Sequence, residues 1–576
     1  MNGLVLLLIG IAVLLCGYIF YGRYLCKKWG VGETNEPTPA HTMEDGIDYV
    51  PAKAPVLMGH HFSSIAGAGP ITGPISAAMF GWLPCLLWIL VGGIFFGGVH
   101  DFGALFASVR HKGKSIGEII SANMSLRAKR LFIIFSYLTL ILVVAAFASI
   151  VAGTFAAKYA DGQVDLAASA TPASVAMVSL LFIVIAVAFG FMVYRRNAPM
   201  GVSTIAGVIA ICLCMAIGMN WHPIYLSNTA WMWIVGLYIA IASVTPVWIL
   251  LQPRDYLSSF LLYAMLAIAA IGVVIAHPNM VDSTGAGLVA IGDGMNAAGI
   301  KQPIFPVLFT TIACGAISGF HSLVSSGTTS KQLDKETDAK PIAYGGMLLE
   351  CVLAVITLVA IAYARQTGHT AGATDIFAGG VAGMASQIAG GNQSLFNILY
   401  TLLVLTYSAF CLTSLDTATR LARFMFQEFW IDGTKGETPE NVTGLKKVMA
   451  NPYIATGITV VLGILLGLNG YAKIWALFGS ANQLLAALGL LAVATWLGNV
   501  GKDNKMFLIP MAFMLCVTIA SLLINSWQQF NVILAGGADW GPYVQVVLGL
   551  MLVILAVVLA IEGVTTIAKQ KKAAKA

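Results

Sequence analysis

The sequence predicts an all-α polytopic membrane protein of about fifteen transmembrane helices, arranged as inverted repeats that each open with a broken helix. Three observations carry this prediction. Hydrophobic residues make up 58% of the 576 residues and charged residues only 10%, a composition foreign to soluble domains. Apolar windows recur along the chain, and basic residues gather in alternate loops. Two apolar segments, in corresponding places of the two halves, are interrupted by glycine and hydroxyl residues.

The individual spans are marked by windows of about 20 apolar residues, the length of helix that crosses the hydrocarbon core. They lie near 3–25, 58–79, 82–107, 131–155, 174–194, 201–219, 230–250, 257–277, 304–330, 342–364, 394–419, 452–468, 472–498, 506–525 and 543–566. No Lys or Arg precedes Leu4, so the first window is expected to be a retained span and not a signal peptide. The nine cysteines form no CxxC pattern, which indicates core residues and not disulfides or zinc ligands.

Charge differs between alternate loops. Lys and Arg are frequent after the first and third spans and in every second loop thereafter, including the tail 569–575, whereas the opposite loops carry few. The positive-inside rule therefore predicts an outside N-terminus and a cytoplasmic C-terminus. The net charge of +6 does not indicate nucleic-acid binding, because the basic residues lie in short loops between apolar runs. The expected partners are the lipid bilayer and a small-molecule substrate.

This span order suggests five parts. They are an additional N-terminal helix (1–28), a cytoplasmic linker (29–57), a first repeat with extra helices (58–277), a second repeat (304–498) and C-terminal helices with a basic tail (499–576). Residues 367–392 are too polar to span and are expected to form an outer re-entrant or lid segment. An odd number of spans per repeat inverts the second copy, which both a five-plus-five arrangement with added helices and a seven-plus-seven arrangement satisfy.

The two interrupted segments predict the substrate site. They read GHHFSSIAGAGPITGP from Gly59 and TIACGAISGFHSLVSSGTTSK from Thr311. An unpaired backbone group in hydrocarbon costs several kcal/mol, so a broken helix is expected only where it lines a cavity or binds a ligand. The predicted substrate residues are Ala66, Gly67, Ala68 and Gly69 in the first segment and Gly315, Ser318, Gly319, His321 and Ser322 in the second.

His321 suggests how a substrate would be bound. The inner half of the second broken helix is expected to begin near Gly319–Ser322, where free N–H groups favour an anion by ~0.3–1 kcal/mol and up to ~2 kcal/mol when partly buried. His321 would add a donor, and no Lys or Arg lies in either break, which favours a single carboxylate. The alternative is that His321 is an ordinary core histidine with a satisfied hydrogen bond.

Two sets of residues are candidates for ion coupling. Carbonyl groups freed between Ala66 and Gly69, together with the hydroxyls of Thr413, Ser414 and Thr417, would form a cation site, unless those hydroxyls bond to their own helix. Glu350 and Asp416 are ionisable residues within spans and hence candidate proton carriers. Asp416 has Arg420 one turn away, so a structural ion pair is the alternative. The coupling ion is a proton or sodium, with a slight preference for the proton because Glu350 has no charged residue nearby in the sequence.

The remaining histidines are candidates for gating. His60 and His61 flank the first break, and His100 and Asp101 end a span beside a basic loop. Neighbouring helical residues point about 100° apart, so His60 and His61 are not expected to share a metal, and no metal or cofactor is predicted. GxSxG, HExxH and GxGxxG-plus-acid motifs are absent, and SSGTTSK lacks the spacing of a phosphate loop, so no enzyme activity is expected.

Three long motifs resemble the signatures of the carbon starvation protein A (CstA) family of inner-membrane transporters: the first broken segment, HDFGALFASVRHKGKSIGEI from His100, and TIACGAISGFHSLVSSGTTSKQL from Thr311. The resemblance covers nearly the whole chain. It implies a bacterial cytoplasmic (inner) membrane location and kinship with LeuT-type amino-acid/polyamine/cation transporters. It also implies that Ala66–Gly69 and Gly315–His321 are unwound substrate-site segments, and that Thr413 and Ser414 lie where sodium-coupled relatives place ion-binding hydroxyls.

The expected function is therefore secondary active import of a small carboxylate-bearing nutrient, a short peptide or pyruvate, by ion- or proton-coupled alternating access. The alternative is a channel or solute sensor that uses the same broken helices. A channel would be expected to have a TVGYG-like filter or an acidic ring, which the sequence lacks. A sensor would be expected to have a soluble output domain, and the apolar spans leave no room for one.

Overall fold

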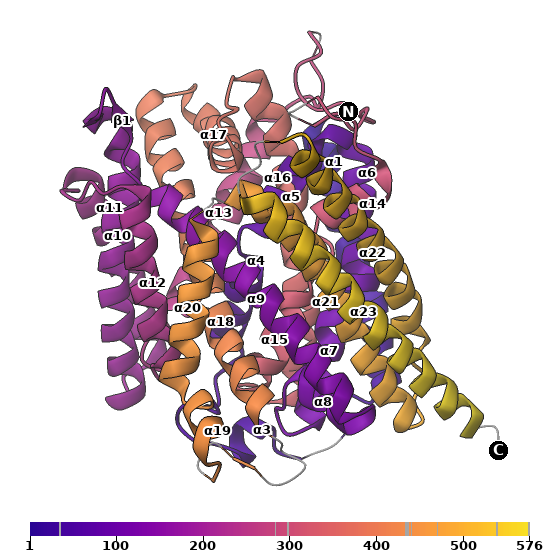
Figure 1. Ribbon diagram of the computed structural model, residues 1–576. Helices are drawn as coiled ribbons and strands as arrows, with labels where there is room; N and C mark the ends of the chain where they lie inside the picture. Colours follow the sequence, from indigo (N-terminus) through magenta and orange to yellow (C-terminus); the bar gives the residue numbers. More distant parts are fainter. Residues whose placement is uncertain are drawn as a thin grey trace.

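The computed structural model describes residues 1–33, 36–282, 284–296, 299–431, 437–438, 441–468, 471–536 and 540–573. The described chain is largely helical, and its long helices run between two ends of the molecule (Figure 1). The N-terminus and α17 (Ala373–Ser386) lie at the upper end in Figure 1, and α3 (Pro39–Thr42), α8 (Ile116–Asn123) and α19 (Gly444–Met449) lie at the lower end with the C-terminus.

Eleven continuous helices in the described part of the chain are long and apolar enough to cross a membrane. They are Gly3–Trp29 (α1 Gly3–Cys16, η1 Gly17–Tyr21, α2 Gly22–Trp29), Trp82–Arg110 (α6 Trp82–Gly92, η3 Gly93–Gly97, α7 Gly98–Arg110), α9 (Leu126–Phe155), α10 with η4 (Leu166–Gly190, Phe191–Arg195), α11 (Met200–Asn220), α13 (Leu251–Ala276), Glu336–Gln366 (η6 Glu336–Asp338, η7 Lys340–Tyr344, α16 Gly345–Gln366), α18 (Gln393–Trp430), α21 (Tyr471–Asn499), α22 (Lys505–Leu534) and α23 (Trp540–Ala573).

Shorter elements complete the architecture. Two apolar helices of less than spanning length, α12 (Asn228–Val244) and α20 (Pro452–Gly467), pack against each other. A small antiparallel hairpin, β1 (Tyr159–Ala160) and β2 (Gln163–Val164), connects α9 to α10. Its turn places Asp161 and Gly162 at positive φ. Short 3-10 turns, η2 (Ala78–Phe80), η5 (Thr329–Lys331) and η8 (Gln387–Ala389), follow α5, α15 and α17.

The two interrupted segments are broken helices, as the sequence predicts. The first consists of α4 (Ala54–Ala66) and α5 (Gly69–Ala77), and the second of α14 (Ile304–Thr311) and α15 (Gly319–Gly327). At the first break, Gly67 has φ +36° and ψ −152°, a backbone conformation that residues with a Cβ atom rarely adopt. The second break is wider, with seven residues between Thr311 and Gly319 outside any helix.

The core of the molecule surrounds the broken helices. The apolar window of Ile474–Asn499 is 94% buried and that of Met200–Asn220 only 22% buried, so α21 is central and α11 peripheral. α4 packs against α13 and α18, and α15 packs against α7 and α21. Residues 367–392, expected as a lid, contain α17, which packs against α13, α16 and α18.

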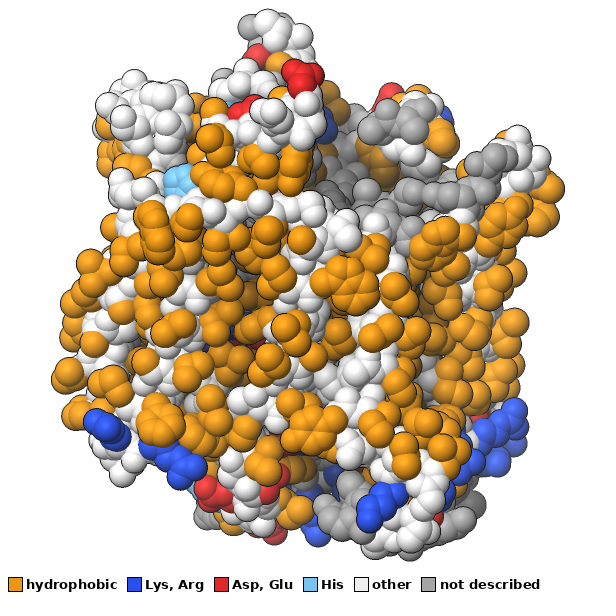
Figure 2. Space-filling model, turned by 60° about the vertical axis from the view of Figure 1, so that its left-hand side comes forward, with side chains coloured by type: hydrophobic (Ala, Val, Ile, Leu, Met, Phe, Trp, Pro, Cys, Tyr) orange, Lys and Arg blue, Asp and Glu red, His pale blue; other side chains and the backbone are white. Residues whose placement is uncertain are grey.

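The surface has the character of a protein embedded in lipid. Figure 2 shows a broad band of hydrophobic side chains, with Lys and Arg gathered near its lower edge. On α11, the side chains of Val202, Ile205, Ile209 and Leu213 recur every three to four residues and are all more than half exposed. The protein is therefore a multi-pass membrane protein, and this helix presents an apolar stripe to the bilayer.

Candidate functional site

The two helix breaks lie against each other at the centre of the molecule. A Cβ atom placed on Gly69 would lie 2.2 Å from Cβ and 2.4 Å from Sγ of Cys314, and one placed on Gly73 would lie 3.0 Å from the carbonyl oxygen of Thr311. Glycine thus permits the close approach of the two segments. All nine predicted substrate residues are buried, so the structure shows this region closed: Ala66, Gly67, Ala68, Gly69, Gly315, Ser318, Gly319, His321 and Ser322.

Asn482 of α21 caps the first turn of α15. Its Oδ1 accepts a hydrogen bond from the backbone N–H of Phe320 at 2.8 Å, and its Nδ2 donates to the hydroxyl of Ser318 at 2.9 Å. The position at which the sequence predicts a substrate carboxylate therefore already holds an acceptor from the protein. Asn482 is not among the predicted site residues, although the polar run Ser480, Asn482 and Gln483 in an otherwise apolar helix is a usable signal.

His321 lies between two carboxylates. Its Nδ1 is 2.8 Å from Oδ2 of Asp101, and its Nε2 is 3.5 Å from Oε2 of Glu350. Two acidic side chains therefore surround the ring and disfavour an anion there, and binding of a substrate carboxylate by His321 stays a prediction. The nearby hydroxyls of Ser322 and Ser326 donate to carbonyl groups of their own helix.

His100 and Asp101 belong to the same buried group. Nδ1 of His100 lies 2.8 Å from Oδ1 of Asp101, and both side chains are fully buried. They follow the π-helical turn η3 in the middle of the helix Trp82–Arg110. The expectation that this pair ends a span beside the basic loop is therefore wrong, because the helix continues for nine residues beyond Asp101, and a gating role stays a prediction.

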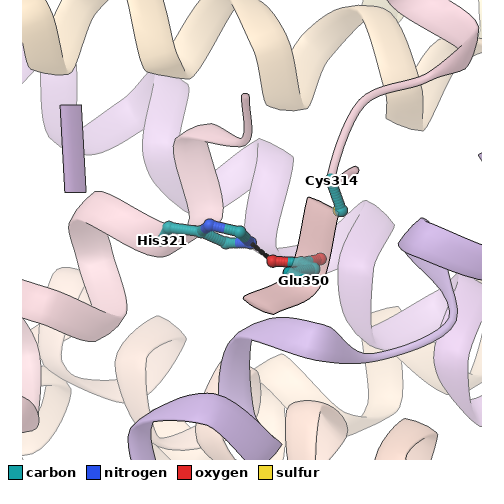
Figure 3. A group of neighbouring side chains, drawn as sticks. All are labelled: Cys314, His321 and Glu350. Atoms are coloured by element: carbon teal, nitrogen blue, oxygen red, sulfur yellow. Dashed lines mark ion pairs between the residues drawn. The ribbon is translucent and has the colours of Figure 1, made fainter. Parts of the chain in front are cut away.

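Cys314, His321 and Glu350 present three groups that can bind a metal. One ligand atom from each lies within 4.8 Å of the others. Figure 3 shows the imidazole of His321 and the carboxylate of Glu350 pointing toward each other from α15 and α16, with Cys314 beside them. Within the described residues, His321 Nε2 and both carboxylate oxygens of Glu350 have no hydrogen-bond partner.

The hydroxyls of α18 face the first broken helix, as the sequence predicts. Ser414 donates to the carbonyl oxygen of Ser64 at 2.8 Å, and the hydroxyls of Thr417 and Ser64 are 3.2 Å apart. A Cβ atom placed on Gly67 would lie 2.9 Å from Oγ of Ser414. Thr413 Oγ1 has no partner among the described residues. The arrangement brings oxygen atoms together, while binding of a cation there stays a prediction.

Asp416 belongs to a buried network of charged and hydrogen-bonding side chains that could not be predicted from the sequence. Arg254 of α13 forms an ion pair with Oδ2 of Asp416, and the hydroxyl of Tyr238 donates to the same oxygen at 2.8 Å. Nη2 of Arg254 lies 3.0 Å from Oδ1 of Asp255, whose Oδ2 lies 2.7 Å from Nδ1 of His60. The network thus joins α4, α12, α13 and α18.

Arg420, the predicted partner of Asp416, binds elsewhere. Its Nη1 lies 3.0 Å from Oδ1 of Asp48, in the segment between α2 and α4. Burial alone would raise the pKa of Asp48, but the positive charges of Lys331, Arg420 and Arg423 hold that pKa below its usual value. The ion pair proposed between neighbours on α18 is therefore corrected to an ion pair between α18 and this loop.

Residues 36–53, called the strap below, cover the lower end of the second broken helix. The backbone N–H of Ala52 donates to the carbonyl of Gln332 at 3.0 Å, and the hydroxyl of Thr38 donates to the carbonyl of Leu333. The expected linker is therefore a packed element. His61 Nδ1 lies 2.9 Å from the hydroxyl of Thr329, so His60 and His61 have separate partners and do not share a ligand.

The upper end of the molecule contains a cavity of about 1290 Å³. It is lined by residues from the upper halves of both broken helices and from neighbouring elements: Ser76, Thr310, Thr311, Arg365, Asn525 and Gln528. The structure thus has an open cavity above the helix breaks and a strap across the lower end of α15. This cavity is called the vestibule below.

Comparisons with known proteins agree with this architecture. A family model described as "Carbon starvation protein CstA" matches residues 2–371 and 363–521. The chain is 32% identical to a "Peptide transporter CstA" of Campylobacter jejuni, over 90% of this chain and 79% of that protein. It is 30% identical to the "Pyruvate/proton symporter BtsT" of Escherichia coli, over 89% of this chain and 80% of that protein.

A solved structure shares the overall fold. It is the Eremococcus coleocola manganese transporter in complex with an aromatic bis-isothiourea substituted compound, which matches with a TM-score of 0.50 and 12% sequence identity. The match covers 92% of this chain and 99% of that transporter. The described helices therefore share the overall fold of that transporter.

Proposed function

The chain belongs to the carbon starvation protein CstA family, and we propose that it imports a short peptide or pyruvate by proton-coupled alternating access. The relatives named above are transporters, which supports a transport role and not an enzymatic one. The main support for this mechanism is that the upper end of the molecule contains an open cavity, whereas the lower end is covered. A vestibule of about 1290 Å³ is open at the upper end, beside Ser76 of α5 and Thr310 of α14, whereas the strap is bonded across the lower side.

The proposed orientation places the upper end outside the cell and the lower end in the cytoplasm. Lys and Arg gather near the lower edge of the hydrophobic band (Figure 2), as the positive-inside rule requires for a cytoplasmic face. The described structure then supports about fifteen crossings: the eleven long helices, the shorter α12 and α20, and the two broken helices. In this orientation the vestibule opens to the outside, and the helix breaks below it are closed.

Packing supports an inverted repeat of five plus five helices. In the first repeat α4 packs against α13, and in the second α15 packs against α21. Likewise α9 packs against α20, and α18 packs against α12. The second helix of each repeat contains a π-helical turn, η3 in the first and η7 in the second. The repeats would be α4–α5, α6–α7, α9, α12 and α13, followed by α14–α15, α16, α18, α20 and α21, with α10 and α11 inserted in the first.

The vestibule offers a first binding region for a carboxylate. Arg365 lies at its wall and is exposed, and the polar side chains of Asn525 and Gln528 complete that surface. The central breaks provide no Lys or Arg and are surrounded by Asp101 and Glu350. A substrate carboxylate is therefore attracted first by Arg365 and reaches the breaks only when the upper halves of the broken helices rearrange.

The buried network around Asp416 supports the proton as coupling ion. Asp255 and Asp416 face the single guanidinium of Arg254, so the network carries an excess negative charge. One proton bound within this network cancels this charge. The other nearby cation, Arg420, is engaged by Asp48. An uncompensated charge in a dry interior is costly, so loss and uptake of this proton would accompany the conformational change.

The experiment that tests this function is counterflow in proteoliposomes that contain the purified protein. We expect trapped unlabelled substrate to drive transient uptake of labelled substrate, with pyruvate and di- and tripeptides compared in parallel. An imposed inward pH gradient should then drive accumulation that a protonophore abolishes. Flux without counterflow would indicate a channel, and binding without flux would indicate a sensor, and either result would overturn the proposal.

A further inference from the structure

We propose that Cys314, His321 and Glu350 form a binding site for a divalent transition-metal ion of the zinc type. The site lies at the second helix break, and the proposed transport function itself requires no metal. The sequence does not predict this site, because the three residues belong to two different spans and their spacing matches no metal motif.

The distances fit a tetrahedral metal site. Ligands about 2.1 Å from a zinc ion lie roughly 3.4 Å apart when the angle between them is tetrahedral. His321 Nε2 and Glu350 Oε2 are 3.5 Å apart, and the three ligand atoms, including Sγ of Cys314, lie within 4.8 Å of one another. Movement of Sγ of Cys314 by up to about 1.3 Å, within reach of a side-chain rotation, brings the thiolate to this separation, and the fourth position stays open.

Asp101 prepares His321 to act as a ligand. Its Oδ2 lies 2.8 Å from Nδ1 of His321 and its Oδ1 lies 2.8 Å from Nδ1 of His100. A carboxylate that accepts from Nδ1 fixes the imidazole tautomer whose Nε2 lone pair is free, and it orients the ring. That lone pair points at the carboxylate of Glu350 with no hydrogen-bonding group between them (Figure 3).

Burial and charge favour a cation in this position. Cys314, His321 and Glu350 are all buried, and buried polar groups without partners are costly. A divalent ion with the Cys314 thiolate and the Glu350 carboxylate forms a neutral unit. A thiolate and an imidazole prefer zinc, cobalt or cadmium over magnesium or calcium, which select oxygen ligands.

Bound metal would hold the second break closed. Cys314 lies within the break, His321 in α15 and Glu350 in α16, so one ion would join all three elements. The same Cys314 side chain is in contact distance of Gly69 in the first break. We therefore expect occupancy of the site to inhibit transport, because the two broken helices could no longer move apart.

The test is cobalt binding to the purified full-length protein in detergent, measured by absorption. Thiolate coordination produces a sulfur-to-cobalt charge-transfer band in the near ultraviolet, and zinc should displace it. We expect the band in the wild type and in Cys351→Ser, a control that changes the buried cysteine next to Glu350. We expect no band in Cys314→Ser and at least tenfold weaker cobalt binding in Glu350→Gln.

A second comparison separates a site from general loss of structure. Asp101→Asn should weaken cobalt binding by about tenfold to a hundredfold, the usual effect of removing such a supporting carboxylate. Asp255→Asn, an equally buried carboxylate bonded to another histidine, should leave cobalt binding unchanged. A wild type without the charge-transfer band, or a band unchanged in Cys314→Ser, would overturn the proposal. Transport is assayed independently, so failure of the metal site and failure of the transport function give different results.

Discussion

The guanidinium of Arg254 forms a buried ion pair with the carboxylate of Asp416, although the two residues lie 162 positions apart in the chain. Arg254 lies on α13 and Asp416 on α18, and both helices pack against α4. The pair therefore connects the first broken helix to its two supporting helices. Any change in charge at this pair is expected to affect how α4 moves during transport.

Asp416→Asn should uncouple transport from the pH gradient. The variant leaves one carboxylate, Asp255, facing Arg254, so the network is neutral without an added proton. In the wild type, coupling to one proton gives about tenfold accumulation per pH unit, since a unit is worth about 1.36 kcal/mol. We expect accumulation by Asp416→Asn to fall to equilibration while counterflow persists.

The matched control for this prediction is Asp375→Asn, which changes a carboxylate of α17 bonded to His369 at the upper end. It should retain gradient-driven accumulation. Full accumulation by Asp416→Asn at a fixed pH gradient would show that the proton is carried elsewhere. Accumulation driven by sodium at constant pH would instead favour the hydroxyl site of Ser414 and Thr417.

Gly69→Ala should abolish transport, and Cys314→Gly should restore it. The added Cβ would lie 2.2 Å from Cβ of Cys314, whereas the next backbone atom, the Cα of Cys314, is 3.5 Å away. Overpacking of this kind costs typically ~1–3 kcal/mol, and removal of the Cys314 side chain leaves an ordinary contact. Uptake by the single variant should be less than about a tenth of wild type.

The double variant Gly69→Ala with Cys314→Ala is the control, because alanine keeps the Cβ that causes the clash. It should not regain activity. Normal uptake by Gly69→Ala alone would mean that the two breaks separate during the cycle without returning to this contact.

Asp48→Ala should open the lower end of the molecule. The ion pair between Asp48 and Arg420 holds the strap against α18, and a charge-assisted hydrogen bond contributes about 1.5–3 kcal/mol. A Cys introduced at the buried Thr328 should then react with a membrane-impermeant reagent from the cytoplasmic side at least about tenfold faster. Glu44→Ala, an exposed change on the same strap, should have no effect.

The same labelling should be insensitive to mild acid. The pKa of Asp48 is lower than usual because the charges of Lys331, Arg420 and Arg423 outweigh the effect of burial. Stabilisation by a carboxylate with a lowered pKa is lost only as the pH falls through that lowered value, below about 3.9. The labelling rate at Thr328→Cys, divided by that of a Cys placed at the exposed Glu44 to remove the pH dependence of thiol reactivity, should therefore stay constant from about pH 7 to about pH 5. A rise in this range would show that Asp48 does not carry the closure.

Arg365→Gln should raise the KM for the substrate by about threefold to tenfold and leave kcat nearly unchanged. The positive charge at the vestibule wall raises the local concentration of a carboxylate, and this effect weakens with salt. Arg365→Lys keeps the charge and should behave as the wild type. An unchanged KM in Arg365→Gln at low ionic strength would exclude this residue from substrate capture.

Labelling from the two sides of the membrane tests the proposed orientation. A Cys at Lys335, in the loop after α15, should react only from the cytoplasm, and a Cys at Asp161, in the β1–β2 turn, only from outside. Both side chains are exposed at opposite ends of the molecule. Labelling of both from one side would contradict the inverted repeat and the proposed outward opening of the vestibule together.

The sequence by itself determined the membrane class, the apolar stretches that form long helices, and the two broken helices. These features depend on local composition: apolar length sets the spans, and glycine at Gly67 and Gly69 interrupts a helix wherever that helix lies. The motifs around both breaks also indicated the family that the comparisons confirm. It could be predicted that Ser414 of α18 faces the first broken helix, where it bonds the carbonyl of Ser64, because the family resemblance places both helices at the same site.

Only the tertiary structure shows which charged side chains form ion pairs with each other. Sequence proximity favoured Arg420 as partner of Asp416, but helix packing brings Arg254 to Asp416 and leaves Arg420 to Asp48. His321 meets Asp101 and Glu350 from two other helices, and Asn482 takes the helix end expected for a ligand. In a membrane interior such pairs form between any helices that present them at the same depth, because an unpaired charge there is costly. The depth of each charged residue in the membrane and the direction in which its side chain points are set by packing over the whole helix bundle. No local pattern in the sequence encodes them.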